Sequence, residues 1–222
     1  LAQAEFNSGL SGGPQTSAEP AYDAVIFDLL TALLDSWTLW NSVAGSDDDG
    51  LRWRKAYLKL TYGAGTYRPY EAIVAEAAVE AGLSASHAAD LARRWDELAP
   101  WPEVPKILGA LSGRAKLAVV TNCSIELGRL AARRAFPDFD TVVTAEEAGA
   151  YKPLRAPYAM TLRMLGTSPE RTLFVAGSAS DVPGAAALGM PIYWHNRIGL
   201  QATDATAADF HERSLERLGS IV

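Results

Sequence analysis

The chain has 222 residues, of which 49 % are hydrophobic and 21 % are charged. These values are typical of one globular domain, or one core with an insertion, and argue against intrinsic disorder. The net charge of −6 disfavours a general nucleic-acid binder, which presents a basic surface. No apolar run approaches the roughly 20 residues of a membrane span. The single cysteine, Cys123, cannot form an internal disulfide, which is consistent with a cytoplasmic protein.

Residues 1–20 lack hydrophobic periodicity and are rich in Gly, Ser, Pro and Ala. We interpret them as a disordered tail or a remnant of cloning. They contain no continuous apolar segment behind a basic start, so we expect no signal peptide. The folded part of the chain is therefore expected to begin near residue 21.

Short apolar runs with bulky or β-branched residues predict buried strands in the rest of the chain. The predicted strands are 22–27, 115–121, 171–177 and 190–195, with a weaker one at 140–145. Their hydrophobicity is mostly continuous rather than alternating, which is typical of strands covered on both faces of a parallel sheet. Helical patterns lie between the later strands, at 124–134, 155–166 and 181–189. This alternation predicts an α/β fold with a doubly wound, Rossmann-like parallel sheet.

The first two predicted strands are too far apart in the chain for one crossover connection. The interval between them contains helical patterns at 37–44, 48–61, 69–82, 86–98 and 103–112. Asp47–Asp49 mark a helix start, and Gly82 and Gly113 mark helix ends. We therefore expect an all-helical cap at 37–112, inserted into a core domain formed by 21–36 and 113–222.

Polar residues follow the predicted strands at the point where each strand ends. They are Asp28, the pair Thr121 and Asn122, Lys152 after the weak strand, and the pair Ser178 and Asp181. Because the carboxyl ends of parallel strands meet at one edge of the sheet, we expect an active site there. Each residue also has a structural interpretation: an Asp or a Thr-Asn pair after a strand often caps a helix or forms a turn, and a lysine before proline is usually solvated.

Four segments in this order resemble the four motifs of the haloacid dehalogenase superfamily. They are FDLLTALLDS (27–36), VVTNCS (119–124), YKP (151–153) and FVAGSASD (174–181). The resemblance covers about residues 21–200 and implies the superfamily's parallel-sheet core with a cap. Each motif is weak alone, but the ordered set with a cap-sized gap is specific.

Departures from the motifs select a branch of the superfamily. Its phosphatases carry a second Asp two positions after the nucleophile, where this chain has Leu30, and a leucine cannot transfer a proton. Ser178 replaces an acidic residue of the fourth motif, which leaves few hard ligands for Mg²⁺. A magnesium-dependent phosphatase is therefore disfavoured. The resemblance instead implies the metal-independent (S)-2-haloacid dehalogenase branch, with no metal and no cofactor.

Three further segments resemble that branch and imply roles for individual residues. RWRKAYLKLTYG (52–63) resembles a cap segment whose Arg holds the substrate or the leaving halide, which here is Arg54, although a solvated surface charge is an equal alternative. KPLRAPY (152–158) resembles a run that carries the catalytic Lys152 and the substrate-binding Tyr158. IYWHNR (192–197) resembles a Trp-x-Asn-Arg ending common there.

The resemblance implies a two-step reaction on a small anionic substrate. Asp28 displaces halide from a 2-haloalkanoic acid, and water then hydrolyses the aspartyl ester to release a 2-hydroxy acid. Lys152 offsets the charge of the carboxylates, and Asp181 takes a proton from water. We expect Thr121 and Asn122 to bind the substrate carboxylate through side-chain and backbone N–H donors. In the branch an Asn positions the water, so either Ser178 substitutes for it or the second step differs. The resemblance further implies a homodimer.

Aromatic residues of the cap are candidates for an apolar wall around the reacting carbon. They are Trp37, Trp40, Tyr57 and Tyr62, although each taken singly fits ordinary packing between cap and core better. His195, beyond the last predicted strand, is a candidate substrate contact or general base, although a lone histidine is more often structural.

Other departures leave two further functions open. The branch usually has Gly-Thr where this chain has Thr31-Ala32, so the hydroxyl that orients the nucleophile is absent or displaced by one residue. Ala176 and Ser178 replace a Ser and an Asn of the fourth motif. These changes also fit an enzyme that opens an epoxide in a small acid, with help from His195 or Tyr158, or a binding protein that has lost catalysis.

Overall fold

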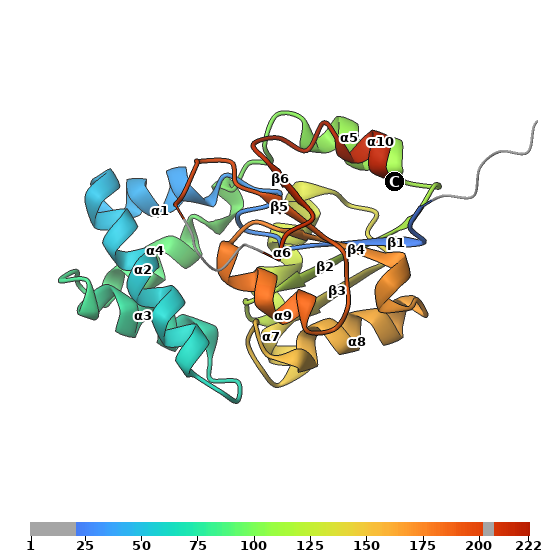
Figure 1. Ribbon diagram of the computed structural model, residues 1–222. Helices are drawn as coiled ribbons and strands as arrows, with labels where there is room; N and C mark the ends of the chain where they lie inside the picture. The colour runs from blue at the N-terminus through green and yellow to red at the C-terminus, as the bar shows by residue number, and fades with distance from the viewer. Residues whose placement is uncertain (1–20, 202–206) are drawn as a thin grey trace, which may run out of the picture.

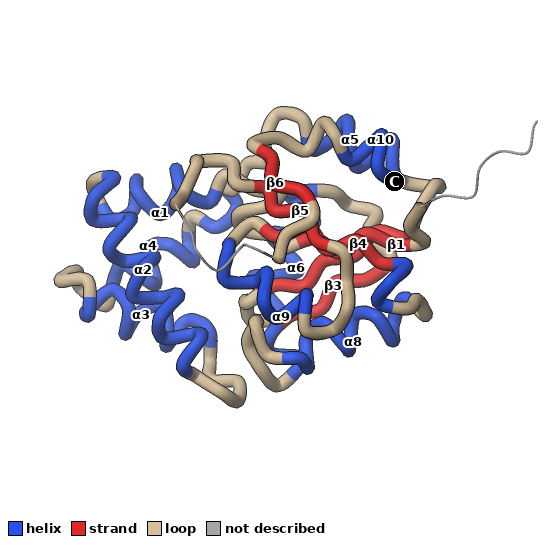
Figure 2. Tube along the Cα trace, in the orientation of Figure 1, coloured by secondary structure: helices blue, strands red, loops and turns tan. Residues whose placement is uncertain are grey.

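A parallel sheet forms the centre of the computed structural model, which describes residues 21–201 and 207–222 (Figures 1 and 2). Within this part of the chain the sheet has six strands in the order β3-β2-β1-β4-β5-β6. The strands are β1 (Ala24–Phe27), β2 (Lys116–Thr121), β3 (Thr141–Thr144), β4 (Thr172–Ala176), β5 (Ile192–His195) and β6 (Phe210–Glu212). The predicted α/β fold is confirmed, including its five predicted strands. The tail predicted at residues 1–20 lies outside the described residues.

The two faces of the sheet bury alternate residues of each strand. Val25 and Phe27 of β1 face one hydrophobic cluster, whereas Ala24 and Ile26 face the other. The helices of the first face are α5 (Val104–Leu111), α6 (Ile125–Ala135) and α10 (Leu218–Ile221). Those of the second face are α8 (Arg155–Leu165) and α9 (Val182–Ala186). Because both faces are covered, continuous apolar runs were the correct signal for these strands.

A cluster of helices follows β1 and lies beside the carboxyl end of the sheet (Figure 1). It consists of α1 (Ser36–Ala44), α2 (Asp47–Gly63), α3 (Tyr70–Glu80), α4 (Ser86–Arg93) and a 3₁₀ turn at Trp95–Glu97. Ser46 caps α2 by accepting a hydrogen bond from Asp49 N, as the predicted helix start requires. The helix predicted at 86–98 is interrupted at Arg94, between the end of α4 at Arg93 and the start of the 3₁₀ turn at Trp95.

Two chain segments join this helical cap to the core and run side by side. Asp35 N donates to Ala99 O (2.8 Å), and Trp101 N donates to Leu33 O (3.0 Å). The next helix, α5, lies beside α10 on the first face of the sheet and away from α1–α4 (Figure 1). The predicted cap range of 37–112 therefore includes a helix that packs on the core, because an amphipathic pattern shows that a face is buried but not what covers it.

The structure contains several short elements that the sequence did not predict. β6 has only three residues and adds to the edge of the sheet beside β5. α7 (Ala145–Ala148) is a single turn held by a capping box between Thr144 and Glu147. Two 3₁₀ turns, at Pro169–Arg171 and Ala179–Asp181, precede β4 and α9. Across the described ranges, no helix is long and apolar enough to cross a membrane.

Candidate active site

A pocket lies between the carboxyl ends of β1, β2 and β4 and the cap helices α1 and α2. β1 is the central strand here, because Phe27 pairs with Val119 of β2 on one side and with Val175 of β4 on the other. The chain ends of these strands therefore bring residues from distant motifs together. The pocket is lined by Asp28, Leu30, Thr31, Trp37, Arg54, Tyr57, Leu58, Tyr62, Thr121, Asn122, Lys152, Gly177, Ser178, Asp181 and Leu200.

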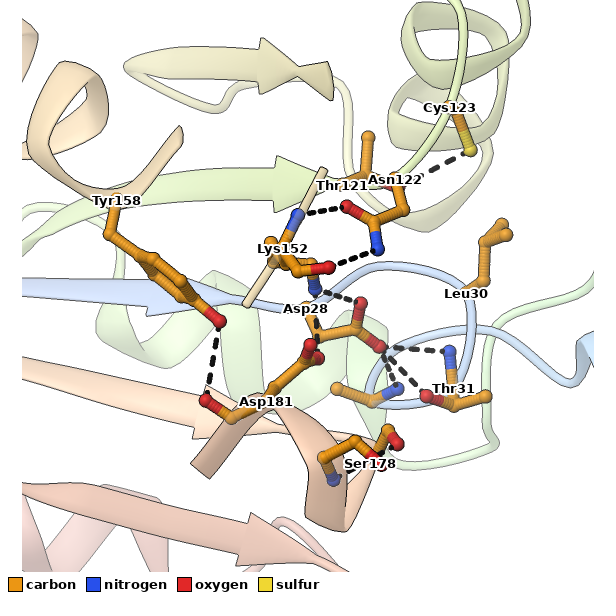
Figure 3. A network of polar contacts seen from close by, with 12 residues as sticks. Asp28, Leu30, Thr31, Thr121, Asn122, Cys123, Lys152, Tyr158, Ser178 and Asp181 are labelled. Atoms are coloured by element: carbon orange, nitrogen blue, oxygen red, sulfur yellow. Dashed lines mark hydrogen bonds and ion pairs between the residues drawn. The ribbon is translucent and has the colours of Figure 1, made fainter. Parts of the chain in front are cut away.

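Asp28 is held by the loop that follows β1 (Figure 3). Its Oδ2 accepts hydrogen bonds from Thr31 Oγ1 (2.8 Å), Thr31 N (3.2 Å) and Ala32 N (3.3 Å), and its Oδ1 accepts one from Lys152 Nζ (2.6 Å). Burial raises the pKa of Asp28, but the charge of Lys152 and these hydrogen bonds outweigh it and lower the pKa overall. The orienting hydroxyl is thus displaced by one residue, to Thr31, and not lost.

Lys152 is the counter-ion of two carboxylates. Its Nζ lies 2.6 Å from Asp28 Oδ1 and 2.9 Å from Asp181 Oδ2, and the residue is only 1 % exposed. Burial by itself lowers the pKa of the ammonium, but the two carboxylates raise it above its ordinary value. Lys152 therefore stays charged, and its ammonium group lies between the carboxylates of Asp28 and Asp181 (Figure 3).

The side chain of Asn122 braces the backbone of Lys152. Asn122 Oδ1 accepts from Lys152 N (2.7 Å), and Asn122 Nδ2 donates to Lys152 O (3.2 Å). The amide side chain therefore positions the lysine, and donation from the backbone N–H of Asn122 to a substrate stays a prediction. Thr121, also predicted to bind the substrate, lines the pocket, and its hydroxyl donates to Cys123 Sγ (3.3 Å).

Asp181 ends the short 3₁₀ turn before α9 and is 3 % exposed. Burial raises the pKa of this carboxyl, Lys152 lowers it and Asp28 raises it, with a net value of about 6. Two carboxylates around one lysine therefore differ: Asp28 is held ionised, whereas Asp181 titrates close to neutral pH, which is where a proton acceptor is most effective.

Arg54 enters the pocket from α2 as a buried cation. Its Nη1 donates to Ser36 Oγ (3.0 Å), and its guanidinium lies 4.2 Å from the ring centre of Trp37 and 5.0 Å from that of Trp40. Burial lowers its pKa. Within residues 21–201 and 207–222, no carboxylate lies within 4.0 Å of this guanidinium. A buried arginine without an anionic partner is suited to bind an anion.

Three residues predicted to contact a substrate lie outside the lining of the pocket. Tyr158, on α8, donates to the backbone oxygen of Asp181 (3.2 Å) and so supports that residue from behind. His195 is fully buried, its Nδ1 donates to Ala32 O (2.8 Å), and burial lowers its pKa. Trp40 packs on Trp53, with ring centres 4.6 Å apart. These three side chains therefore support the backbone and the packing around the pocket, because each contacts neighbouring protein groups.

The remaining wall of the pocket comes from α1 and α2. Trp37, Tyr57 and Tyr62 line it as expected, and Tyr57 also donates to Asn122 O (3.0 Å), which joins cap to core. Leu58, Leu200 and Ser36 were missed. Leu58 lies four residues after Arg54, a helical spacing that places both on one face and could have revealed it. Ser36, the first residue of α1, and Leu200, in the segment after β5, carry no such signal.

The donor set of the pocket does not fit a divalent cation. In the described part of the chain, no group of three or more His, Cys, Asp or Glu side chains could hold a metal. Lys152 Nζ occupies the position between Asp28 and Asp181, and the Leu30 carbonyl accepts a hydrogen bond from Ser36. A Mg²⁺ ion requires several free oxygen ligands in an octahedral arrangement.

Known proteins are similar to this chain in sequence and in structure. A family model described as haloacid dehalogenase-like hydrolase matches residues 22–189. Haloacetate dehalogenase H-2 from Moraxella sp. (strain B) is 27 % identical over 194 residues, which cover 80 % of this chain and 87 % of the relative. The (S)-2-haloacid dehalogenase of Xanthobacter autotrophicus is 30 % identical over 119 residues, which cover 53 % of this chain and 47 % of the relative.

The fold is also that of a solved dehalogenase. The structure of L-2-haloacid dehalogenase from Xanthobacter autotrophicus, with chloropropionic acid covalently bound, aligns with a TM-score of 0.80. The alignment covers 90 % of this chain and 98 % of the other, at 22 % identity.

Proposed function

The chain belongs to the haloacid dehalogenase-like hydrolase family, and we propose on this premise that it releases halide from short 2-haloalkanoic acids through an ester on Asp28. The observation that carries the proposal is a pocket in which an ionised Asp28, paired with Lys152, lies together with the buried cation Arg54, which has no carboxylate within 4.0 Å among the described residues. The named relatives described above act on haloacetate or 2-haloacids, which is the same substrate class.

In the first step, Asp28 Oδ1 attacks the carbon that bears the halogen, and the carbon–halogen bond breaks. Negative charge then moves from the carboxylate to the halide, and Arg54 offsets it in a dry environment where such an interaction is strong. The side chains of Trp37, Tyr57 and Leu58 form the apolar wall around the reacting carbon.

In the second step, water attacks the Asp28 carbonyl carbon and Asp181 accepts its proton. If Oδ1 carries the ester, Oδ2 becomes the oxygen on which negative charge develops. Thr31 Oγ1, Thr31 N and Ala32 N already donate to Oδ2, which gives the intermediate three hydrogen-bond donors. Lys152, bonded to Oδ1, stabilises the departing alkoxide.

The size of the pocket favours short acids. Its volume is about 60 Å³, enough for about four to six water-sized groups at roughly 10–15 Å³ each. A haloacetate or a 2-halopropionate fits this space. The alternative function, opening of an epoxide with help from His195 or Tyr158, is less well supported, because both residues lie outside the pocket lining.

The experiment is to measure halide release from chloroacetate and 2-chloropropionate in the presence of a chelator. We expect turnover by the wild type and by Asp138→Asn, which changes an exposed carboxylate. We expect only background release from Asp28→Asn, because an amide is a poor nucleophile. In ¹⁸O-labelled water, a single turnover should place the label in Asp28 and not in the product. Release by Asp28→Asn at the wild-type rate, or none by the wild type, would refute the proposal.

A further inference from the structure

A tyrosine of the cap meets a serine of the core at the edge of the pocket. Tyr62 comes from α2 and Ser178 from the loop after β4, and both line the pocket. The Tyr62 hydroxyl lies 3.4 Å from Ser178 Oγ. Arg54, Leu58 and Tyr62 are spaced by four residues along α2, so one face of this helix supplies all three to the pocket.

Ser178 is held close to the nucleophile by the residue before it. A Cβ at Gly177 would collide with Ala32 N and Thr31 Oγ1, so the absence of a side chain lets this loop lie directly against the loop of Asp28. Ser178 Oγ accepts a hydrogen bond from Ser180 N (3.3 Å). Its own proton and its second lone pair are therefore directed to other partners, of which Tyr62 is one.

The Tyr62 hydroxyl is a neutral donor close to a carboxylate. Burial raises its pKa, the charge of Asp181 raises it further, and the result is about 12. The phenol therefore keeps its proton at neutral pH. The Tyr62 hydroxyl, the Ser178 hydroxyl and the Asp181 carboxylate thus belong to one pocket with Asp28, and Tyr62 lies close enough to Asp181 for the carboxylate to raise the phenol pKa.

The resemblance already implies that Ser178 positions the water that hydrolyses the Asp28 ester, and we propose that Tyr62 of the cap holds the same water. This inference rests on the proposed function and concerns its second step alone. The water oxygen bonds to Asp28 Cγ and one water proton passes to Asp181. The bond between Cγ and the substrate oxygen then breaks, and the hydroxy acid leaves with the proton from Asp181. The Asp28 carboxyl so formed releases its proton to solvent.

A consequence is that the cap takes part in hydrolysis. The side chain of Ser178 is shorter than the Asn side chain that the resemblance leads one to expect, and the phenol of Tyr62, 3.4 Å from Ser178 Oγ, supplies a second contact from the cap. The displacement of halide does not use this water. Loss of the Tyr62 hydroxyl should therefore slow the second step and spare the first.

The experiment compares the two steps in Tyr62→Phe by rapid quenching with chloroacetate. Halide measures ester formation, and intact mass measures the carboxymethyl ester on the protein. We expect the first-turnover rate of halide release to stay within about twofold of wild type. Ester decay should slow roughly 100-fold, as for the loss of one preorganised donor, so that the ester accumulates. Ser178→Ala should show the same pattern.

Two comparisons separate a water-holding role from a structural one. Tyr67→Phe removes a cap hydroxyl that accepts from Tyr70 N outside the pocket, and should leave both steps unchanged. The double variant of Tyr62→Phe with Ser178→Ala should decay faster than the product of the single effects predicts, since both act on one water.

The outcomes also distinguish this inference from the proposed function. Wild-type ester decay in Tyr62→Phe, or an equal slowing of both steps, would overturn the water-holding role while halide release still supports the dehalogenase. No halide from the wild type would overturn the proposed function itself.

Discussion

Replacing Lys152 with methionine should destabilise the protein strongly, because it leaves Asp28 and Asp181 buried without their counter-ion. Both ion pairs are short, at 2.6 and 2.9 Å, and the lysine is 1 % exposed. Removal of one partner from a buried ion pair costs about 3–5 kcal/mol. At about 2–4 °C per kcal/mol for a chain of this length, the expected decrease in Tm is about 6–20 °C at pH 7.

The destabilisation caused by Lys152→Met should decrease as the pH falls, because the two carboxyl groups left without a counter-ion become protonated. Without Lys152, burial and mutual repulsion raise the pKa of both carboxyls in the folded state. A raised carboxyl pKa destabilises the folded state above that pKa, and protonation relieves the effect as the pH falls. The difference in Tm between variant and wild type should therefore narrow from pH 7 to pH 5.

The assay is thermal unfolding followed by circular dichroism at both pH values. Lys59→Met is the matched control, because it removes an exposed ion pair with Glu80, in which the lysine side chain is 74 % exposed. Such a pair contributes about 0–1 kcal/mol. If Lys152→Met lowers Tm no more than Lys59→Met, or if the difference does not narrow on acidification, the argument from the buried charges is wrong.

Two further predictions concern the reaction. Arg54→Met should lower the first-turnover rate of halide release by at least about 100-fold, because it removes the buried cation, whereas Arg52→Met, two residues earlier and exposed, should leave the rate unchanged. Equal rates in the two variants would contradict the role of Arg54. Ester decay requires ionised Asp181, and esterification removes the Asp28 charge that raises the Asp181 pKa, so the rate of ester decay should stay level from pH 6 to 8 and fall only at lower pH. A rate that rises about tenfold per pH unit between pH 6 and 8 would contradict this assignment.

The polar residues at the strand ends were predictable because a parallel sheet has a simple geometry. Asp28, Lys152 and Asp181 follow three different strands, and strand polarity alone requires them to meet at one edge. For the hydroxyl that orients Asp28, the sequence left two alternatives open, absence or displacement by one residue to Thr31. It reaches Asp28 because the tight loop after β1 directs Thr31 N and Oγ1 and Ala32 N to the same oxygen.

Side-chain direction was not predictable in the same way. Trp37 lines the pocket while Trp40, three residues later on the same helix, packs on Trp53. Tyr158 and His195 lie close to the motifs in sequence, but their polar atoms bond the backbone behind the site. The rotation of each helix or strand about its own axis decides which side chains point into the pocket. That rotation depends on contacts across the whole core.

The sequence by itself determined which carboxylates, which lysine and which hydroxyl residues follow each buried strand. This was possible because hydrophobic runs and motif spacing are local properties of the chain. The tertiary structure alone decided which of these groups bond one another. Asn122 braces Lys152, α5 covers the core, and Tyr62 reaches Ser178 across the boundary of cap and core. These pairings join residues far apart in the chain, and only the packing of helices on the sheet brings them within hydrogen-bond distance.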